Sequence, residues 1–201
     1  MERMTIGKMG RPRAFDEDVA LEAAMRVFWE KSYEGATMAD LTKAMGINRS
    51  STYATFGDKE ALFLRAVDRY RTGPMAYVQK ALELPTFRET VVSLLQGTVE
   101  FLATPGNPRG CLSIQGALAC GTDAEPVKQV MIERRKEGET ALKSRIQRAQ
   151  QEGELDSEID PADFARYISI LVTGLFIQAA NGATRAEMIR SVEIALKFMS
   201  Y

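Results

Sequence analysis

The sequence has no histidine and only two cysteines, which restricts the chemistry open to it. Without an imidazole there is no Ser–His or Cys–His catalytic pair, no histidine-liganded zinc or haem site, and no proton shuttle near neutral pH. Gly-rich phosphate loops are also missing, together with the strand–helix alternation that carries them. We therefore expect a protein that is not an enzyme and needs no cofactor or metal. An all-helical enzyme using carboxylates, lysine or tyrosine is the third-ranked alternative.

Net charge and long apolar runs are scarce as well. The 201 residues include 26 basic and 27 acidic side chains, so any nucleic-acid-binding surface must arise from local placement of basic groups. The most apolar run, 167–180, is shorter than the ~20 residues of a membrane-spanning helix and contains polar side chains. No signal-peptide core is present. These features predict a cytoplasmic protein with no membrane partner.

Basic residues gather at the N-terminus. Within residues 1–15, four basic side chains oppose the single acidic Glu2. The segment Gly10-Arg11-Pro12-Arg13 is similar to the minor-groove core of AT-hook peptides, which predicts that Arg11 and Arg13 enter an A/T-rich minor groove. A solvated tail is the alternative.

Residues 37–56 predict two short helices joined by a tight turn. Thr37 and Asp40 form a capping pair for a helix at 38–45, Gly46 ends that helix, and Asn48 caps a second helix at 49–56. This is the layout of a DNA-reading helix-turn-helix. The second helix keeps a polar outer face, formed by Arg49, Ser50, Ser51 and Thr55.

Apolar periodicity elsewhere predicts an all-α fold. A helix at 16–31 precedes the pair, and the helix that follows it opens at Asp58 and breaks at Gly73–Pro74. We therefore predict a flexible basic arm at 1–15, a helix-turn-helix head at 16–73, and a ligand-binding and dimerisation domain at 74–201. Helices expected in the last domain are 74–82, 87–103, 111–119, 125–151, 160–180 and 185–199.

From about Phe15 to Phe63 the chain resembles the TetR/AcrR family of bacterial transcriptional regulators. The matching positions are Ala23, Ala24, Val27 and Phe28, then Tyr33, Thr37 and 41–47, and finally Tyr53, Phe56, 58–60, Leu62 and Phe63. The chain differs at Ser32, where the family usually has a helix-ending glycine, at Thr42, where it has alanine, and at Thr55, where it often has histidine.

The resemblance implies how the head would meet DNA. Arg49, Ser50 and Ser51 would reach base edges, whereas Thr37, Tyr53, Thr55 and Lys59 would hold phosphates. Tyr53 also fits a core aromatic, and Lys59 fits either a phosphate clamp at a helix N-terminus or a solvated lysine.

The last two predicted helices are apolar nearly all round, which requires cover on both sides. A homodimer of the four-helix type would provide it, with burial inside one subunit as the alternative. The predicted interface consists of Phe164, Ile168, Leu171, Leu175, Met188, Val192, Leu196 and Met199.

The second domain is longer than dimerisation requires, and the resemblance implies that it binds a small effector. Side chains with an apolar body and a polar or adaptable end are candidate pocket residues, although each also fits plain core. They are Met75, Tyr77, Phe101, Cys111, Gln115, Met131, Tyr167, Phe176 and Gln178.

Cys111 carries a further hypothesis, because a thiol at a helix start has a lowered pKa and raised reactivity. Some family members with a similar Gly-Cys-Leu sense electrophiles or oxidants. A buried, inert cysteine is the favoured alternative.

Taken together, the sequence predicts a homodimeric, ligand-responsive DNA-binding repressor. It would bind double-stranded DNA at a palindromic operator and be released by a small, largely apolar effector. A helical adaptor that docks protein is the rival interpretation.

Overall fold

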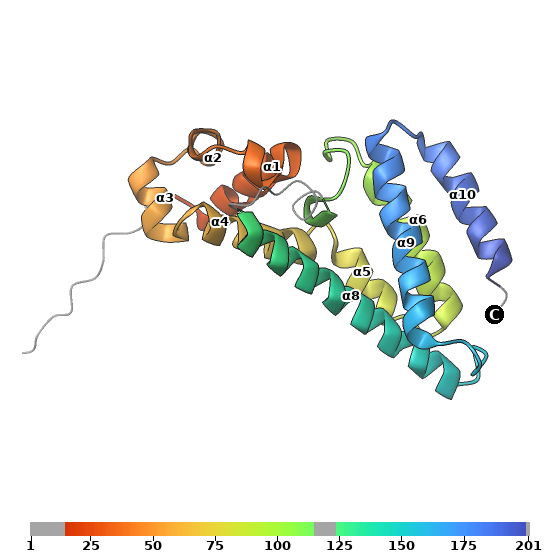
Figure 1. Cartoon of the computed structure of the whole chain (residues 1–201). Coiled ribbons are helices and arrows are strands. Elements are labelled where there is room, and N and C mark those ends of the chain that lie inside the picture. The colour runs from red at the N-terminus through yellow and green to blue at the C-terminus, as the bar shows by residue number, and fades with distance from the viewer. Residues whose placement is uncertain (1–14, 115–123, 200–201) are drawn as a thin grey trace, which may run out of the picture.

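The computed structural model describes residues 15–114 and 124–199 of the chain, and its described elements are all helices. The all-α prediction is therefore confirmed. The helices are α1 (Glu17–Gly35), α2 (Met38–Met45), α3 (Arg49–Phe56), α4 (Lys59–Thr72), α5 (Ala76–Leu82), α6 (Phe87–Ala103), α8 (Glu125–Gln151), α9 (Pro161–Ala180) and α10 (Arg185–Phe198). Helices α1–α4 form the head at one end of the molecule, and α6, α9 and α10 lie at the other, as Figure 1 shows.

Side-chain caps explain where most helices begin. Each cap places a hydroxyl, carboxylate or amide oxygen on backbone N–H groups that have no partner within the helix. In α2, α6 and α10 the third helical residue also bonds back to the cap, completing a capping box. The capping residues are Asp16, Thr37, Asn48, Asp58, Thr86, Asp160 and Thr184.

Ser32 interrupts α1 with a non-helical backbone. Its φ of 64° lies in the region that favours glycine, and helical geometry resumes beyond it to Gly35. The helix was predicted to end at about Lys31, so the observed element is longer but bent at that point. A residue other than glycine is strained in this conformation.

The predicted break between α4 and α5 is confirmed. Helix α4 ends at Thr72, Gly73 caps it, and α5 begins only at Ala76. The N–H of Met75 donates to the carbonyl of Tyr70 at 2.9 Å, which turns the chain sharply.

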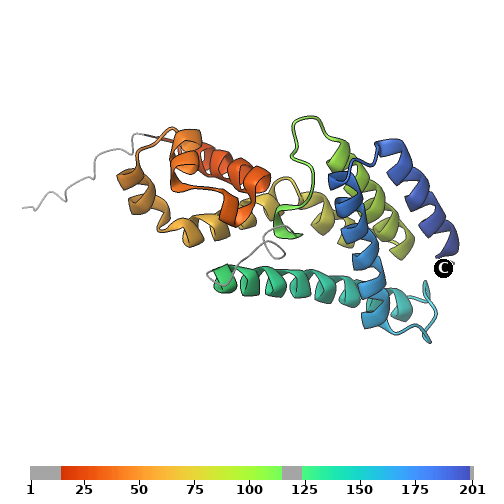
Figure 2. The same ribbon diagram turned by 45° about the horizontal axis from the view of Figure 1, so that its top comes forward.

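Two apolar clusters hold the molecule together. The first contains the inner faces of α1–α4 and continues into the second domain through Phe101, Cys111, Leu112, Met131 and Phe176. The second cluster packs α6, α8, α9 and α10 against one another. The core of the head therefore does not end at the α4–α5 break. Figure 2 shows the segment that follows α6 passing between the head and the helices of the second domain.

Helix α9 is the one described helix that is long and apolar enough, by length and composition, to cross a membrane. In the fold it packs against α6 and α8, with Ile168, Leu175 and Ala179 buried in the second cluster.

Candidate nucleic-acid interface

Helix α3 has one buried edge, and most of its remaining surface faces solvent. Thr52 and Phe56, one turn apart, are 0% and 3% exposed and face the head core. Arg49, Ser50 and Tyr53 are exposed on the opposite side. The structure therefore gives α3 the polar outer face that the sequence predicts. Ser51 and Thr55 are partly buried at its margins, and the exposed Ala54, which the sequence analysis did not single out, lies on the same face.

Arg49 and Tyr53 are paired on this face. Their guanidinium and phenol lie one turn apart, with Arg49 Nη2 donating to the Tyr53 hydroxyl at 3.3 Å. The guanidinium carbon lies 5.5 Å from the centre of the Tyr53 ring. The pair holds both polar groups at the surface, where they can meet a base edge or a phosphate.

The cap of α2 joins the helix-turn-helix to α1. The Thr37 hydroxyl donates to Asp40 Oδ2 at 2.7 Å, and Asp40 accepts Lys31 Nζ at 2.8 Å. Lys31 first, and Thr37 second, hold the pKa of Asp40 well below its usual range. The Thr37 hydroxyl, for which the sequence analysis predicted a phosphate contact, thus already serves the cap.

Lys59 occupies the first position of α4, as predicted, but it is not a freely solvated lysine. Its ammonium lies 4.6 Å from the centre of the Tyr33 ring. Burial lowers the pKa of Lys59, while the nearby Glu34 opposes that shift. The side chain is therefore held against the head.

Arg65 is a positioning residue that the sequence analysis missed. Its Nη1 donates to the carbonyl of Thr55 at 3.1 Å, and its guanidinium lies 4.6 Å from the ring centre of Phe56. Its Nη2 approaches Glu17 of α1 at 3.5 Å. Arg65 thus ties the end of α3 to α1 and α4. No local pattern reveals this role, because Glu17 lies 48 positions away in sequence.

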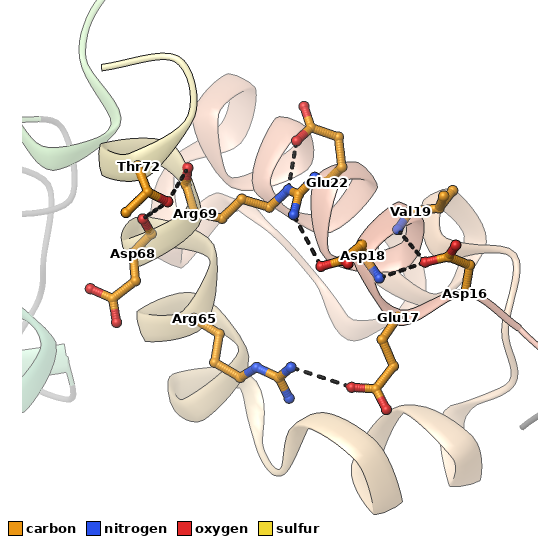
Figure 3. Close-up of polar contacts among 9 residues, drawn as sticks. All are labelled: Asp16, Glu17, Asp18, Val19, Glu22, Arg65, Asp68, Arg69 and Thr72. Carbon is orange, nitrogen blue, oxygen red and sulfur yellow. Dashed lines mark hydrogen bonds and ion pairs between the residues drawn. The ribbon is translucent and has the colours of Figure 1, made fainter. Parts of the chain in front are cut away.

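A second arginine of α4 continues this connection (Figure 3). Arg69 Nε donates to Glu22 at 2.8 Å and its Nη1 to Asp18 at 3.2 Å, so α4 is tied to the first turns of α1. The two helices present one rigid support to α2 and α3. Arg11 and Arg13 of the predicted arm lie outside the described residues.

The candidate effector residues are only partly brought together. Phe101, Cys111, Met131 and Phe176 are buried in the first cluster, and Met75 and Tyr77 pack against it. Gln115 lies outside the described residues. The prediction needs correction for two members: Tyr167 is 42% exposed and stacks on Phe164, and Gln178 is exposed at a groove between α9 and α10. Both point away from the cluster because they lie on the outer side of α9.

Four aromatic rings surround Phe101 at the centre of this cluster. Trp29 stacks on it at 5.4 Å between ring centres, and Tyr77, Phe176 and Tyr70 follow at 5.9, 5.9 and 6.1 Å. Trp29 and Tyr70 come from the head, and the other rings from the second domain. Trp29 therefore joins the two parts of the molecule, a role that the sequence analysis did not identify.

Cys111 does not have the reactive environment predicted for a helix start. Burial raises the pKa of its thiol, and this outweighs the opposing effect of hydrogen bonds from Tyr70 and from backbone N–H groups. The thiol is 5% exposed and accepts a hydrogen bond from the Tyr70 hydroxyl at 3.6 Å. Cys120, the other cysteine of the sequence, lies outside the described residues.

The predicted dimer stripe requires a correction. Ile168, Leu175, Met188, Val192 and Met199 are buried inside the subunit, and Phe164, Leu171 and Leu196 pack against the same second cluster. The stripe therefore faces its own subunit, because α6 and α8 cover it. Large apolar side chains are exposed on other sides of these helices, namely Tyr167, Ile170 and Ile177 on α9 and Ile194 and Phe198 on α10. A groove of about 740 Å³ runs between the two helices.

Comparison with known proteins agrees with this arrangement. Residues 20–66 match the family described as "Bacterial regulatory proteins, tetR family", and residues 88–192 match "Tetracyclin repressor-like, C-terminal domain". The HTH-type transcriptional repressor ComR of Escherichia coli K12 is 27% identical over 94% of this chain and 90% of its own. The HTH-type transcriptional regulator YezE of Bacillus subtilis 168 is 34% identical over 80% of this chain and 84% of its own.

A solved structure extends the likeness to a DNA complex. A cysteine mutant of the TetR family transcriptional regulator CifR, complexed with 26-bp double-strand operator DNA, is 37% identical and superposes with a TM-score of 0.90. The match covers 94% of this chain and all of that one. With one family match at the head and another across more than half of the chain, this protein belongs to the TetR family of bacterial helix-turn-helix transcription regulators.

Proposed function

We propose that the protein is a homodimeric repressor that binds a palindromic operator and is released by a small, largely apolar effector. The observation that carries this proposal is the exposed polar face of α3, with Arg49, Ser50 and Tyr53 outward on a helix whose other edge is packed. A helix of this kind fits the major groove, where its side chains reach base edges.

The apolar surface at the opposite end supports the dimer. Ile170, Ile177, Ile194 and Phe198 are 44–78% exposed on α9 and α10, the two helices farthest from the head along the chain. Exposed apolar side chains gathered on neighbouring helices favour a self-complementary contact with a second copy. Such a dimer carries two heads, which a palindromic operator requires.

The aromatic cluster around Phe101 supports effector binding. Its side chains are mostly apolar, with phenol groups at Tyr70 and Tyr77, so an effector that packs among them would be largely apolar. Sensing of electrophiles through Cys111 is not favoured, because the thiol is buried and its pKa is raised. An enzymatic role is not proposed.

The test is binding to DNA at two salt concentrations. A labelled duplex selected from random sequences by the protein itself serves as the operator, and an unselected duplex of equal length is the control. We expect tighter binding to the selected duplex and affinity for both duplexes that falls linearly on a log–log salt plot. Absence of DNA binding at low salt would leave the protein-docking adaptor as the better interpretation.

A further inference from the structure

One dipeptide of the second domain receives buried hydrogen bonds from two helices of the head. Trp29 of α1 donates through Nε1 to the carbonyl of Gly110 at 3.0 Å. Tyr70 of α4 donates through its hydroxyl to the sulfur of Cys111 at 3.6 Å. We propose that Gly110 and Cys111 form a latch through which Trp29 and Tyr70 act as positioning residues, holding the head in the orientation that operator binding needs.

Burial distinguishes the latch from the other contacts between the head and the second domain. Trp29 and Tyr70 are 1% and 0% exposed, their ring centres lie 4.8 Å apart, and Phe101 packs on both rings. Other polar links between the two parts, among the described residues, lie at the surface: the ion pairs Asp68–Arg134 at 2.9 Å and Arg71–Glu137 at 3.2 Å, and a hydrogen bond from Arg26 to the Gly106 carbonyl at 3.2 Å. Solvated ion pairs contribute little and are screened by salt, so the buried contacts dominate the coupling.

The backbone at the latch is also restricted. Gly110 has a φ of 107°, which residues other than glycine rarely adopt. This backbone conformation sets the direction of the Gly110 carbonyl. Gly110 and Cys111 are consecutive, so a displacement of either one moves both acceptors, the one bonded to Trp29 of α1 and the one bonded to Tyr70 of α4. Ion pairs between α4 and α1 then carry that displacement to the whole head.

This route differs from transmission through the α4–α5 break. The break leaves Gly73 and Pro74 as a bend in the chain, whereas the latch contacts the head directly at two points. It also explains how the candidate effector cluster reaches the DNA-binding surface. Phe101 and Cys111 belong to that cluster and touch Trp29 and Tyr70, so a ligand there changes the latch without an intermediary.

The inference rests on the proposed function, and its test begins with the wild type. Failure of the wild type to prefer a duplex that it selected from random sequences overturns the proposed function itself. With that preference established, operator and unselected-duplex affinities are measured for Tyr70→Phe and Trp29→Phe, well below their melting temperatures. Thr98→Val is the matched control, because it removes a buried hydroxyl whose hydrogen bonds, to the Leu94 carbonyl at 2.7 Å and to the Tyr77 hydroxyl at 3.0 Å, lie within the second domain.

We expect Tyr70→Phe and Trp29→Phe to weaken operator binding by about fivefold or more, and Thr98→Val to have little effect. Binding to the unselected duplex should change little, because it does not need two heads held in register. A role confined to stability would lower the melting temperature without changing the ratio of the two affinities. Wild-type affinity ratios in Tyr70→Phe would overturn the latch, even if Trp29→Phe fails to fold.

Trp29 is the single tryptophan of the sequence, so its fluorescence reports on the latch directly. We expect saturating operator DNA to shift the emission of the wild type and of Thr98→Val. Tyr70→Phe removes the hydrogen bond to Cys111. The free variant should therefore emit at a different wavelength from the free wild type. Identical emission of Tyr70→Phe and wild type, free and bound, would count against coupling between the two hydrogen bonds.

Discussion

At the scale of single residues, the side chains on and around α3 are of two kinds. Some are free to read the DNA sequence, and others hold the helix in position. Arg49 is exposed and paired only with Tyr53 of its own helix among the described residues, so it is free to leave that ring for a base edge. Lys59 is held over Tyr33 and Arg65 is committed to Thr55 and Glu17. Arg49 is therefore suited to reading the DNA sequence, whereas Lys59 and Arg65 are suited to holding their parts of the head in place.

Arg49→Ala should therefore cost about 1–3 kcal/mol of binding free energy at the selected operator and relax base preference at one position. Lys59→Ala should weaken binding to all sequences alike and reduce the salt slope by about one. Fluorescence anisotropy with the operator and with single-base variants measures both effects. If the two substitutions reduce every affinity by the same factor, Arg49 contacts phosphate and not bases.

The burial of Cys111 predicts low reactivity. In a Cys120→Ser background only Cys111 remains, and its alkylation by iodoacetamide can be followed by mass spectrometry. We expect the folded protein to react at least about tenfold more slowly than the urea-unfolded protein at neutral pH, since burial disfavours the thiolate. Equal rates in the two states would restore the electrophile-sensing hypothesis.

At the scale of helices, the capping box of α2 makes the helix-turn-helix sensitive to acid. The pKa of Asp40 is lowered in the folded state, chiefly by Lys31 and then by Thr37. A lowered folded-state pKa means that ionised Asp40 stabilises the fold above its ordinary value of 3.8. That stabilisation is lost progressively as the pH falls from 3.8 toward the lower folded-state value.

Asp40→Asn should consequently be less stable than wild type near neutral pH, with a difference that shrinks below the ordinary carboxyl pKa. Urea unfolding at a series of pH values measures this, followed by far-UV circular dichroism. Glu30→Gln, at an exposed position of α1, is the control and should track wild type throughout. A constant difference between Asp40→Asn and wild type at every pH would mean that the cap, and not the ionised carboxylate, is responsible.

At the scale of the whole molecule, the head and the proposed dimer surface lie at opposite ends (Figure 1). Ile194→Asp places a charge at an exposed apolar position of α10, where it would be desolvated by a second copy. We expect this variant to be monomeric in sedimentation experiments at micromolar concentration, with unchanged helicity, and to lose high-affinity operator binding.

Val19→Asp is the matched control, because Val19 is also an exposed apolar residue, at 67%, but lies on α1 of the head. It should remain dimeric. If the wild type sediments as a monomer, or if Ile194→Asp stays dimeric, the exposed face of α9 and α10 is not the subunit interface.

Local signals in the sequence determined the helices and the polar face of α3. Caps such as Thr37 and Asn48 act on residues two or three positions away, and the period of Thr52 and Phe56 acts over one turn. The same local reasoning located the break at Gly73. Interactions of this range depend only on neighbouring residues, so the sequence alone was sufficient to predict them.

Only the tertiary structure decided how the helices meet. The last two helices have more than one apolar side, and α6 and α8, distant in sequence, determined that Ile168 and Val192 face inward and Ile194 outward. Burial beneath Tyr70 likewise reversed the effect expected of a helix start on Cys111. Trp29 meets a carbonyl 81 positions away, and no periodicity links the two. Such choices depend on which surfaces exclude water together, a property of the packed chain and not of any segment within it.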